Sequence, residues 1–337
     1  MWQKQETREF LDPEVLSALS GLPLLARRPM RGSVSGKHVS PTKGSSVEFA
    51  QYRKYVPGDD LRRLDWRAHG RSDRYYVKEF EADTNLRCCL VIDTSGSMEF
   101  GTTEKKGGLA KAIKSGARAL TGKPGAAASA TPKANAARMS KLDYARRLAA
   151  TIGYLAVAQG DAVGLSCVSG GETRHLPPRR NPSHLRAIFD AMEETRGQGE
   201  TNLAEVLHEL AETTRQAAMV IVISDFFLDP DQLRSCFEHL RFRKHDLSLF
   251  HLLDPMELNF NFNRPTRFLD MEGGTAIFAE PSEIADRYQQ ALDQYLERFN
   301  EIVVQTGIDY HRVTLDEPYQ QVLANFLTRR ATARGMR

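Results

Sequence analysis

The 337-residue sequence contains few cysteines and few tryptophans. Its four cysteines are Cys88, Cys89, Cys167 and Cys236, and none of them has the C-x-x-C spacing of common zinc sites. Cys88 and Cys89 are adjacent, so on a strand they would point to opposite faces and could not readily share a metal. We expect free, buried thiols in a reducing compartment.

Several motifs and segments are also absent. No apolar run approaches the roughly 20 residues that span a bilayer. The N-terminal segment has acidic residues and no sustained apolar core, unlike a secretory signal. We therefore expect a cytoplasmic protein without a membrane span. No G-x-x-x-x-G-K-[ST] motif is present, so we do not expect the chain to hydrolyse ATP. The His208-Glu209 pair begins a zinc-protease pattern, but Glu212 stands where that pattern needs histidine.

The positive charge of the chain is concentrated in one segment. The whole sequence has a net charge of +3 and the apolar and charged contents of a soluble globular protein. Residues 101–140 contain six lysines, two arginines and one glutamate, so this segment carries +7 and the rest of the chain −4. The segment is low-complexity sequence rich in Ala, Gly and Lys, for which we expect disorder or weak helicity.

Apolar strand patterns alternate with amphipathic helix patterns from residue 87 onward. The expected strands are 88–92, 162–168, 174–176, 218–224, 247–253 and 309–313, with a hairpin within 266–278. The expected helices are 141–159, 184–195, 202–215, 230–242, 282–306 and 318–330. Near-continuous apolar strands between helices are typical of a parallel sheet covered on both faces. We therefore expect an α/β fold with a doubly wound, mostly parallel, Rossmann-like sheet over residues 85–335, interrupted by a basic insert at 101–140.

Two segments precede this predicted domain. Residues 1–46 suggest a helix from about residue 12 to 30, limited by Pro23, followed by a loop rich in Gly and Ser. Residues 47–84 are dense in charged and aromatic side chains and contain Pro57-Gly58, which suits the centre of a type II turn. We expect this second segment to include a β-hairpin.

The stretch LVIDTSGSMEF places polar oxygens at the end of an apolar strand. Asp93, Ser95 and Ser97 lie at alternate positions, so in an extended segment their side chains would point the same way. One carboxylate and two hydroxyls suit a hard cation such as Mg²⁺ or Mn²⁺, with Ca²⁺ as a further candidate. The alternative is structural, with the two serines capping a polar turn.

Two other segments could complete such a site. Thr201 follows a glycine-rich loop and precedes a helix, and Asp225 ends the apolar run in VIVISDFF. In a doubly wound sheet, ligands bind beyond the carboxyl ends of the strands at the topological switch point. We therefore expect Thr201 and Asp225 to join Asp93, Ser95 and Ser97 there.

These residues resemble the metal-ion-dependent adhesion site of von Willebrand factor A domains, D-x-S-x-S followed by a distant Thr and then an Asp. The resemblance implies that Ser95, Ser97 and Thr201 coordinate the cation, and that Asp93 and Asp225 bind it directly or through water. It also implies that an open coordination position accepts a carboxylate from a partner protein.

The preceding segment resembles a bacterial family called domain of unknown function 58. Its hallmark, Y-x-P-G-D-D-x-R-x-(I/L)-D-W ahead of an A-like domain, matches residues 55–66. The resemblance implies that the chain is an adaptor or co-chaperone for a MoxR-type AAA+ ATPase acting on an unknown client protein. Arg62, Arg63, Asp65, Trp66 and Arg67 either touch a partner or fix a charged hairpin to the sheet.

We expect a non-enzymatic, cation-dependent protein-binding module, and two alternatives remain. A metal-dependent phosphohydrolase could use Asp93 as its nucleophile, although Ser95 stands where the second acid of such enzymes is expected. A nucleic-acid-binding protein could use the basic insert, although residues 101–140 contain no aromatic side chain to stack on bases. We therefore expect no specific nucleic-acid partner.

Overall fold

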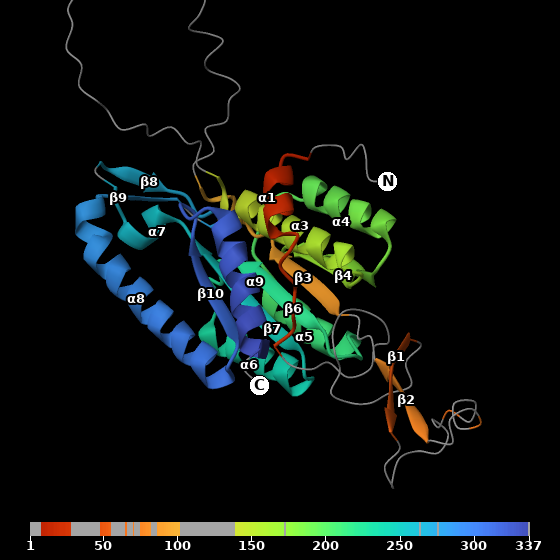
Figure 1. The fold of residues 1–337 in the computed structure, drawn as a ribbon. Helices are drawn as coiled ribbons and strands as arrows, with labels where there is room; N and C mark the ends of the chain where they lie inside the picture. Colours follow the sequence, from red (N-terminus) through yellow and green to blue (C-terminus); the bar gives the residue numbers. More distant parts are fainter. Residues whose placement is uncertain are drawn as a thin grey trace, which may run out of the picture.

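A six-stranded sheet forms the centre of the protein (Figure 1). The computed structural model describes residues 8–27, 48–54, 65, 70, 75–81, 86–101, 139–171, 173–262, 264–274 and 276–335. The strands are β3 (Arg87–Asp93), β4 (Ala162–Val168), β5 (Arg174–Arg179), β6 (Met219–Ser224), β7 (Asp246–Leu253) and β10 (Asp309–Thr314). Their order across the sheet is β10-β7-β6-β3-β4-β5.

The topology confirms the predicted doubly wound, mostly parallel sheet. Only the edge strand β5 runs antiparallel to its neighbour, and the other adjacent pairs of this sheet are parallel. The first strand, β3, lies between β4 and β6, so the winding direction reverses between β3 and β6. The carboxyl ends of these two strands form the switch point at which ligands of such folds bind.

Helices cover both faces of the sheet (Figure 1). One face carries α1 (Pro13–Leu19), α3 (Lys141–Ala158), α4 (Pro182–Glu194) and α9 (Tyr319–Gly335). The other carries α5 (Leu203–Thr213), α6 (Pro230–Phe242) and α8 (Pro281–Thr306). Cys88 belongs to the first core and Cys89 to the second, and all four cysteines are buried and free, which confirms the predicted thiols.

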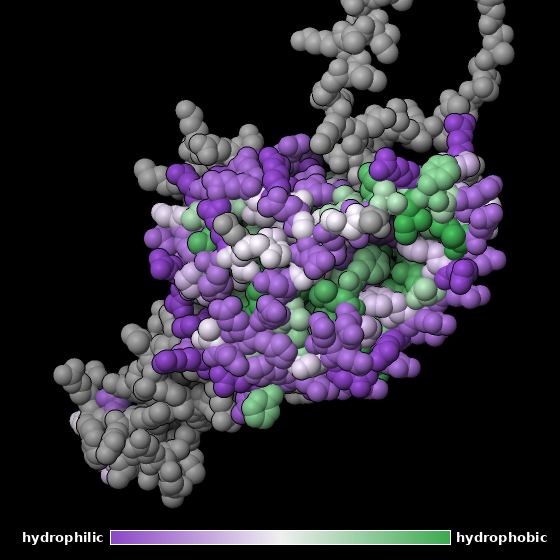
Figure 2. Space-filling view, turned by 180° about the vertical axis from the view of Figure 1, so that it is seen from behind, coloured by the Kyte–Doolittle hydropathy of each residue, from purple (hydrophilic) through white to green (hydrophobic). Residues whose placement is uncertain are grey.

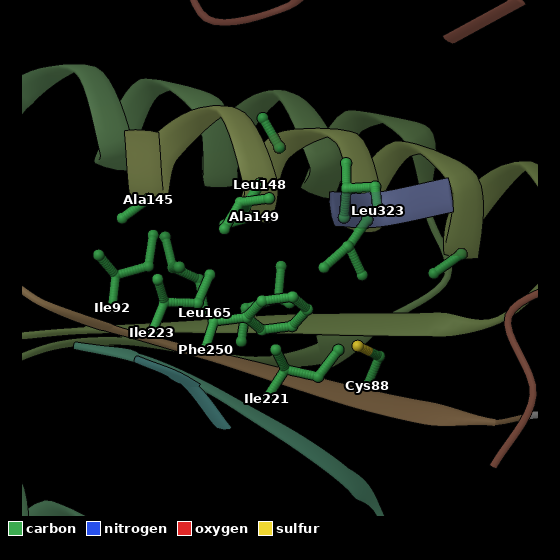
Figure 3. Close-up of a cluster of buried hydrophobic side chains, with 14 of the residues drawn as sticks. Cys88, Ile92, Ala145, Leu148, Ala149, Leu165, Ile221, Ile223, Phe250 and Leu323 are labelled. Carbon is green, nitrogen blue, oxygen red and sulfur yellow. The ribbon is translucent and has the colours of Figure 1, made fainter. Parts of the chain in front are cut away.

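Helix α3 shows how the sequence produces this packing. Ser140 caps its amino end by accepting a hydrogen bond from the backbone nitrogen of Asp143 at 3.1 Å. Its inner face presents small and aliphatic side chains, including Ala145, Leu148 and Ala149, to the apolar side chains of the sheet (Figure 3). Burying each large aliphatic side chain of this layer contributes about 1.5–3 kcal/mol to stability.

Short elements complete the described chain. β1 (Glu48–Lys54) and β2 (Tyr76–Glu81) form an antiparallel pair, which agrees with the predicted N-terminal hairpin. β8 (Thr266–Phe268) and β9 (Ile277–Ala279) form a second antiparallel pair, where the sequence predicted a hairpin. The sequence patterns did not predict the 3₁₀ helix η2 (Gly96–Glu99) or helix α7 (Pro255–Asn259).

The N-terminal helix is shorter than the sequence predicted. α1 ends at Leu19, before Pro23, and the chain then continues without regular structure against α3. The side chain of Gln159 accepts a hydrogen bond from Leu24 N at 2.9 Å and donates one to Leu22 O at 3.0 Å. Irregular backbone can therefore replace the expected helical turns, because Gln159 satisfies two of its polar groups.

Some predictions fall on residues that are not described. These are the structure of the basic insert between 102 and 138, the Pro57-Gly58 turn, and the 55–66 motif apart from Asp65. Within the described part of the chain, no helix is long and apolar enough to cross a membrane.

Candidate functional site

Asp93 ends β3 at the switch point and is almost completely buried. Its Oδ1 accepts a hydrogen bond from the backbone nitrogen of Ser95 at 3.0 Å. Its Oδ2 accepts one at 2.6 Å from the hydroxyl of Ser224, the last residue of β6. Asp93 thus joins the ends of the two strands that flank the switch point.

Ser95 and Ser97 meet at this point, but not by the predicted geometry. Their hydroxyl oxygens lie 3.0 Å apart. The expectation that residues 93–97 stay extended is wrong, because η2 begins at Gly96 and includes Ser97. The tight 3₁₀ turn, rather than strand alternation, brings the two hydroxyls together beside Asp93.

The loop that carries Thr201 is attached to the same turn. Gln198 N donates to Thr94 O at 3.0 Å, and Gly96 N donates to Gly199 O at 2.9 Å. The Thr201 hydroxyl accepts a hydrogen bond from Leu203 N at 3.2 Å at the start of α5. The structure therefore places the Thr201 loop against the Asp93–Ser97 turn. One lone pair of the Thr201 hydroxyl already accepts the hydrogen bond from the start of α5.

Asp225 directly follows β6 and is also buried. The next residue, Phe226, has a φ of 51°, which is uncommon for a bulky side chain. Phe226 is held in this conformation by burial against Phe237 and Phe299, and its carbonyl accepts a hydrogen bond from the Tyr295 hydroxyl. The turn after β6 is therefore held rigidly, and it fixes the position of Asp225.

Lys141 is the site residue that the sequence did not predict. Its ammonium donates to Asp225 Oδ2 and to Glu257 Oε1, both at 2.7 Å, and its side chain is fully buried. The carboxylates of Asp225 and Glu257 outweigh the effect of burial and raise the pKa of Lys141. Asp225 is thus already paired with the ammonium of Lys141. The site therefore differs from the predicted one, in which all five residues face a single metal ion.

The position of Lys141 at the start of a predicted helix could have pointed to its role in the site. It is the first residue of α3, where the positive end of the helix dipole disfavours a cation. A lysine there that is also buried requires anionic partners, and Glu257 and Asp225 supply them from two other elements. Spacing rules could not find these partners, because the three residues are far apart in the sequence.

The basic insert joins the domain beside this lysine. Lys141 N donates to Phe100 O at 3.0 Å, so the chain on either side of the insert is held together by a backbone hydrogen bond. The ammonium of Lys141 also lies 5.7 Å from the ring centroid of Phe100 and 5.4 Å from that of Phe227. The insert therefore leaves and re-enters the domain next to the candidate site.

The buried ionic cluster at the site consists of Asp93, Asp225, Glu257 and Lys141, and its charges do not balance. The three acidic residues supply three carboxylates, and Lys141 supplies one ammonium. Burial, followed by the charge of Asp225, raises the pKa of Asp93 to about 6. A buried net charge of this kind is costly unless a cation accompanies it. These four side chains carry a net charge of −2, which one divalent cation would neutralise.

The donor set fits a hard divalent cation. Two hydroxyls 3.0 Å apart beside a buried carboxylate are oxygen ligands of the kind that Mg²⁺ and Mn²⁺ prefer. Among the described residues, no group of three or more His, Cys, Asp or Glu side chains is arranged to hold a metal. A cation here would therefore depend on the hydroxyls of Ser95 and Ser97.

An exposed apolar surface lies near the site. Large hydrophobic side chains on and beside the β8–β9 hairpin are exposed: Leu269, Met271, Ile277 and Phe278. Figure 2 shows hydrophobic side chains gathered at this end of the molecule, at the upper right of the view. Apolar patches next to a polar site are typical of protein-binding surfaces.

Comparison with known proteins gives a family match and distant structural similarity. A family model described as "Protein of unknown function DUF58" matches residues 51–126 and 118–295. The uncharacterized protein Rv1480 of Mycobacterium tuberculosis is 27% identical over 251 residues, covering 73% of this chain and 68% of that protein.

Two solved structures are similar at low sequence identity. The conserved hypothetical protein BatB from Bacteroides thetaiotaomicron has a TM-score of 0.43 and 15% identity, covering 74% of this chain and 100% of that chain. The SpRpn10 VWA domain has a TM-score of 0.36 and 10% identity, covering 72% of this chain and 95% of that chain.

Proposed function

The chain belongs to the DUF58 family of proteins of unknown function, and from this premise we propose that it is a non-enzymatic protein-binding module whose site holds a divalent cation. The observation that carries the proposal is the meeting of the Ser95 and Ser97 hydroxyls, 3.0 Å apart, beside the buried Asp93 at the switch point of the sheet. Open α/β sheets bind their ligands at this position.

Each site residue has a distinct role in this proposal. Ser95 and Ser97 bind Mg²⁺ or Mn²⁺ directly, and the loop of Thr201 contributes its hydroxyl. Asp93 binds the cation or a water molecule on it. Asp225 compensates the cation's charge while it holds Lys141 at 2.7 Å. When bound, the cation would offer a coordination position to a carboxylate.

The proposed binding partner carries an acidic residue at its contact surface. On the resemblance of residues 55–66 and 90–98 to MoxR-associated proteins, we assign this partner to the MoxR-type AAA+ ATPases. The chain would then direct such an ATPase towards a client protein. The exposed apolar residues of the β8–β9 hairpin, near the cation, supply contact area for the partner.

The geometry of Asp93 favours a role in binding over one in catalysis. Both of its carboxylate oxygens accept hydrogen bonds, from Ser95 N and from the Ser224 hydroxyl, and the side chain is buried. A nucleophilic aspartate needs an oxygen free to reach a phosphorus atom and an acid near the leaving group. Asp93 is better suited to hold a cation than to form an aspartyl-phosphate.

Affinity purification from the native host tests the proposal. The bait is the full chain as wild type, as the Ser95→Ala/Ser97→Ala variant, and as the control Ser235→Ala/Ser282→Ala, which changes two exposed serines. We expect an AAA+ ATPase to be recovered with wild type and control in Mg²⁺, and to be lost in EDTA or with the site variant. Equal recovery in every condition would contradict the cation-dependent mechanism.

A further inference from the structure

The connection between β8 and β9 lies directly on the Asp93–Ser97 turn. A methyl group on Gly96 would lie 1.9 Å from the carbonyl oxygen of Met271 and 3.3 Å from the nitrogen of Glu272. These contacts are possible only because residue 96 has no side chain. The backbone at Met271 and Glu272 therefore packs against the peptide that joins the two candidate ligands Ser95 and Ser97.

This packing places the side chain of Glu272 at the site. Glu272 is partly buried, and its carboxylate lies within interaction range of the Ser97 hydroxyl. The Asp270 side chain fixes the loop by accepting a hydrogen bond from Glu272 N at 2.9 Å. Glu272 is thus held at a serine that the proposed function assigns to the cation.

The surroundings of Glu272 are unfavourable for a carboxylate without a cation. The charged side chains that act on it are Asp225, Asp270 and Glu200, and all three are acidic. Like charges held close together in a partly desolvated site repel each other, so this geometry needs a compensating cation.

We propose that Glu272 is an internal carboxylate ligand, which binds the cation beside Ser97 in the free protein and occupies the position that a partner's carboxylate takes. The proposal rests on the proposed function, because it requires a cation at Ser95 and Ser97. Exchange of Glu272 for a partner's acidic residue replaces one carboxylate by another, so the charge around the cation stays constant. The exchange requires the β8–β9 connection to move away from Gly96.

The consequence is a closed site that selects its partner. A ligand carried by the same chain has an effective concentration in the millimolar range or above. A partner's carboxylate must therefore be supported by further contacts. The exposed Leu269 and Met271 lie on the connection that has to move, and the exposed Phe278 lies on the adjoining strand β9. An isolated carboxylate, such as acetate, is expected to compete poorly with Glu272.

The test uses the full chain with Mn²⁺ alone as the probe. Calorimetry gives the Mn²⁺ affinity, and the proton relaxation rate of water gives the number of exchangeable water molecules on the bound ion. The variants are Glu272→Ala, Ser95→Ala/Ser97→Ala, and Glu200→Gln as a matched control that removes a nearby exposed carboxylate. Circular dichroism confirms that each variant is folded.

We expect Glu272→Ala to bind Mn²⁺ about 10-fold more weakly or worse, with roughly one additional water molecule on the ion. Acetate at millimolar concentration should bind the Mn²⁺-loaded Glu272→Ala variant and displace that water, but leave wild type unchanged. Glu200→Gln should keep the wild-type hydration number.

The results separate this inference from the proposed function. If wild type and Ser95→Ala/Ser97→Ala bind Mn²⁺ equally or not at all, the cation site itself is wrong. If binding depends on the serines but Glu272→Ala changes neither affinity nor hydration, only the internal-ligand proposal is overturned. Tighter Mn²⁺ binding by Glu272→Ala would also overturn it, since Glu272 would then obstruct the cation.

Discussion

Two buried ionic clusters lie at opposite ends of the sheet, and they differ in charge balance. At the amino end, Arg330 Nη1 donates to Asp246 Oδ2 and Arg330 Nε to Asp309 Oδ2, each at 2.9 Å. The exposed guanidinium of Arg27 lies 3.9 Å from Asp309, so one buried and one exposed guanidinium group face two carboxylates. Contact with Arg330 and His311 overcomes the effect of burial and lowers the pKa of Asp309.

At the carboxyl end, one ammonium faces several carboxylates. Lys141 pairs with Asp225 and Glu257, while Asp93 and Glu272 lie close by without a cationic partner among the contacts described for them. A balanced cluster needs nothing further to be stable, whereas an unbalanced one favours binding of a cation. This difference supports the proposal that the carboxyl-end cluster binds a cation, whereas the charges of the amino-end cluster are already paired within the chain.

The largest expected effects on stability come from removing the basic side chain of each cluster. Arg330→Met and Lys141→Met should each lower the free energy of unfolding by about 3–5 kcal/mol, because buried carboxylates lose their partner. In urea titrations, MgCl₂ at roughly 100 times its dissociation constant should raise the stability of Lys141→Met by more than it raises the stability of wild type or Arg330→Met, which both keep Lys141. An equal response of both variants to Mg²⁺ would remove the proposed difference between the clusters.

The second prediction concerns the effect of Mg²⁺ on the unaltered protein. A cation that binds only the folded state adds about 2.7 kcal/mol at 100 times its dissociation constant. We expect thermal unfolding to shift upward with Mg²⁺ in wild type and to lose that shift in Ser95→Ala/Ser97→Ala. The matched control is Ser248→Ala, which removes a hydroxyl from the amino-end cluster. A control that also loses the shift would contradict the assignment.

The third prediction concerns a neutral histidine near the amino end of the sheet. Burial, followed by the charge of Arg243, lowers the pKa of His245 to about 4, and its Nδ1 accepts a hydrogen bond from Ala218 N at 3.1 Å. Between about pH 6.5 and 4 the unfolded chain binds this proton and the folded chain does not. Stability should therefore fall by roughly 1–2 kcal/mol as the pH falls through this window.

Denaturation at several pH values checks the histidine prediction. The variant His245→Asn keeps an acceptor for Ala218 N but cannot titrate in this range. The dependence of its unfolding free energy on pH between 6.5 and 5 should be shallower than that of wild type. Identical slopes would show that His245 makes no contribution to acid sensitivity.

The smallest effect is expected for an exposed ion pair. Arg298 lies 2.7 Å from Asp231, but both side chains are more than half exposed. Arg298→Met should change the unfolding free energy by less than about 1 kcal/mol, in contrast to Arg330→Met. A loss comparable to that of Arg330→Met would mean that burial does not explain the difference between the two arginines.

The order of the elements and the fold class were predictable from the sequence. The apolar runs at 88–92, 218–224 and 247–253 can be buried on both faces only in a covered sheet, and the structure places them in β3, β6 and β7. Helix α7 was missed because it is only five residues long, too short to show a periodic pattern. Its capping box at Asp254 and Glu257 was the available signal.

The candidate site was predictable only in part. Sequence spacing pointed to Asp93, Ser95 and Ser97, although the cause of their convergence is a 3₁₀ turn rather than an extended strand. The contacts of Lys141 and Glu272 depend on elements more than 80 residues apart in the chain, and local patterns carry no information about such pairs.

By itself, the sequence determined which segments are buried and which carboxylate and hydroxyls end the first strand of the sheet, because periodicity and burial are local properties. Only the tertiary structure decided the charge balance at each end of that sheet. Lys141 joins Asp225 and Glu257, and Glu272 reaches Ser97, through the packing of helices and loops over the strand ends. The electrostatic energy of a charge depends on its neighbours in space, and folding sets those neighbours.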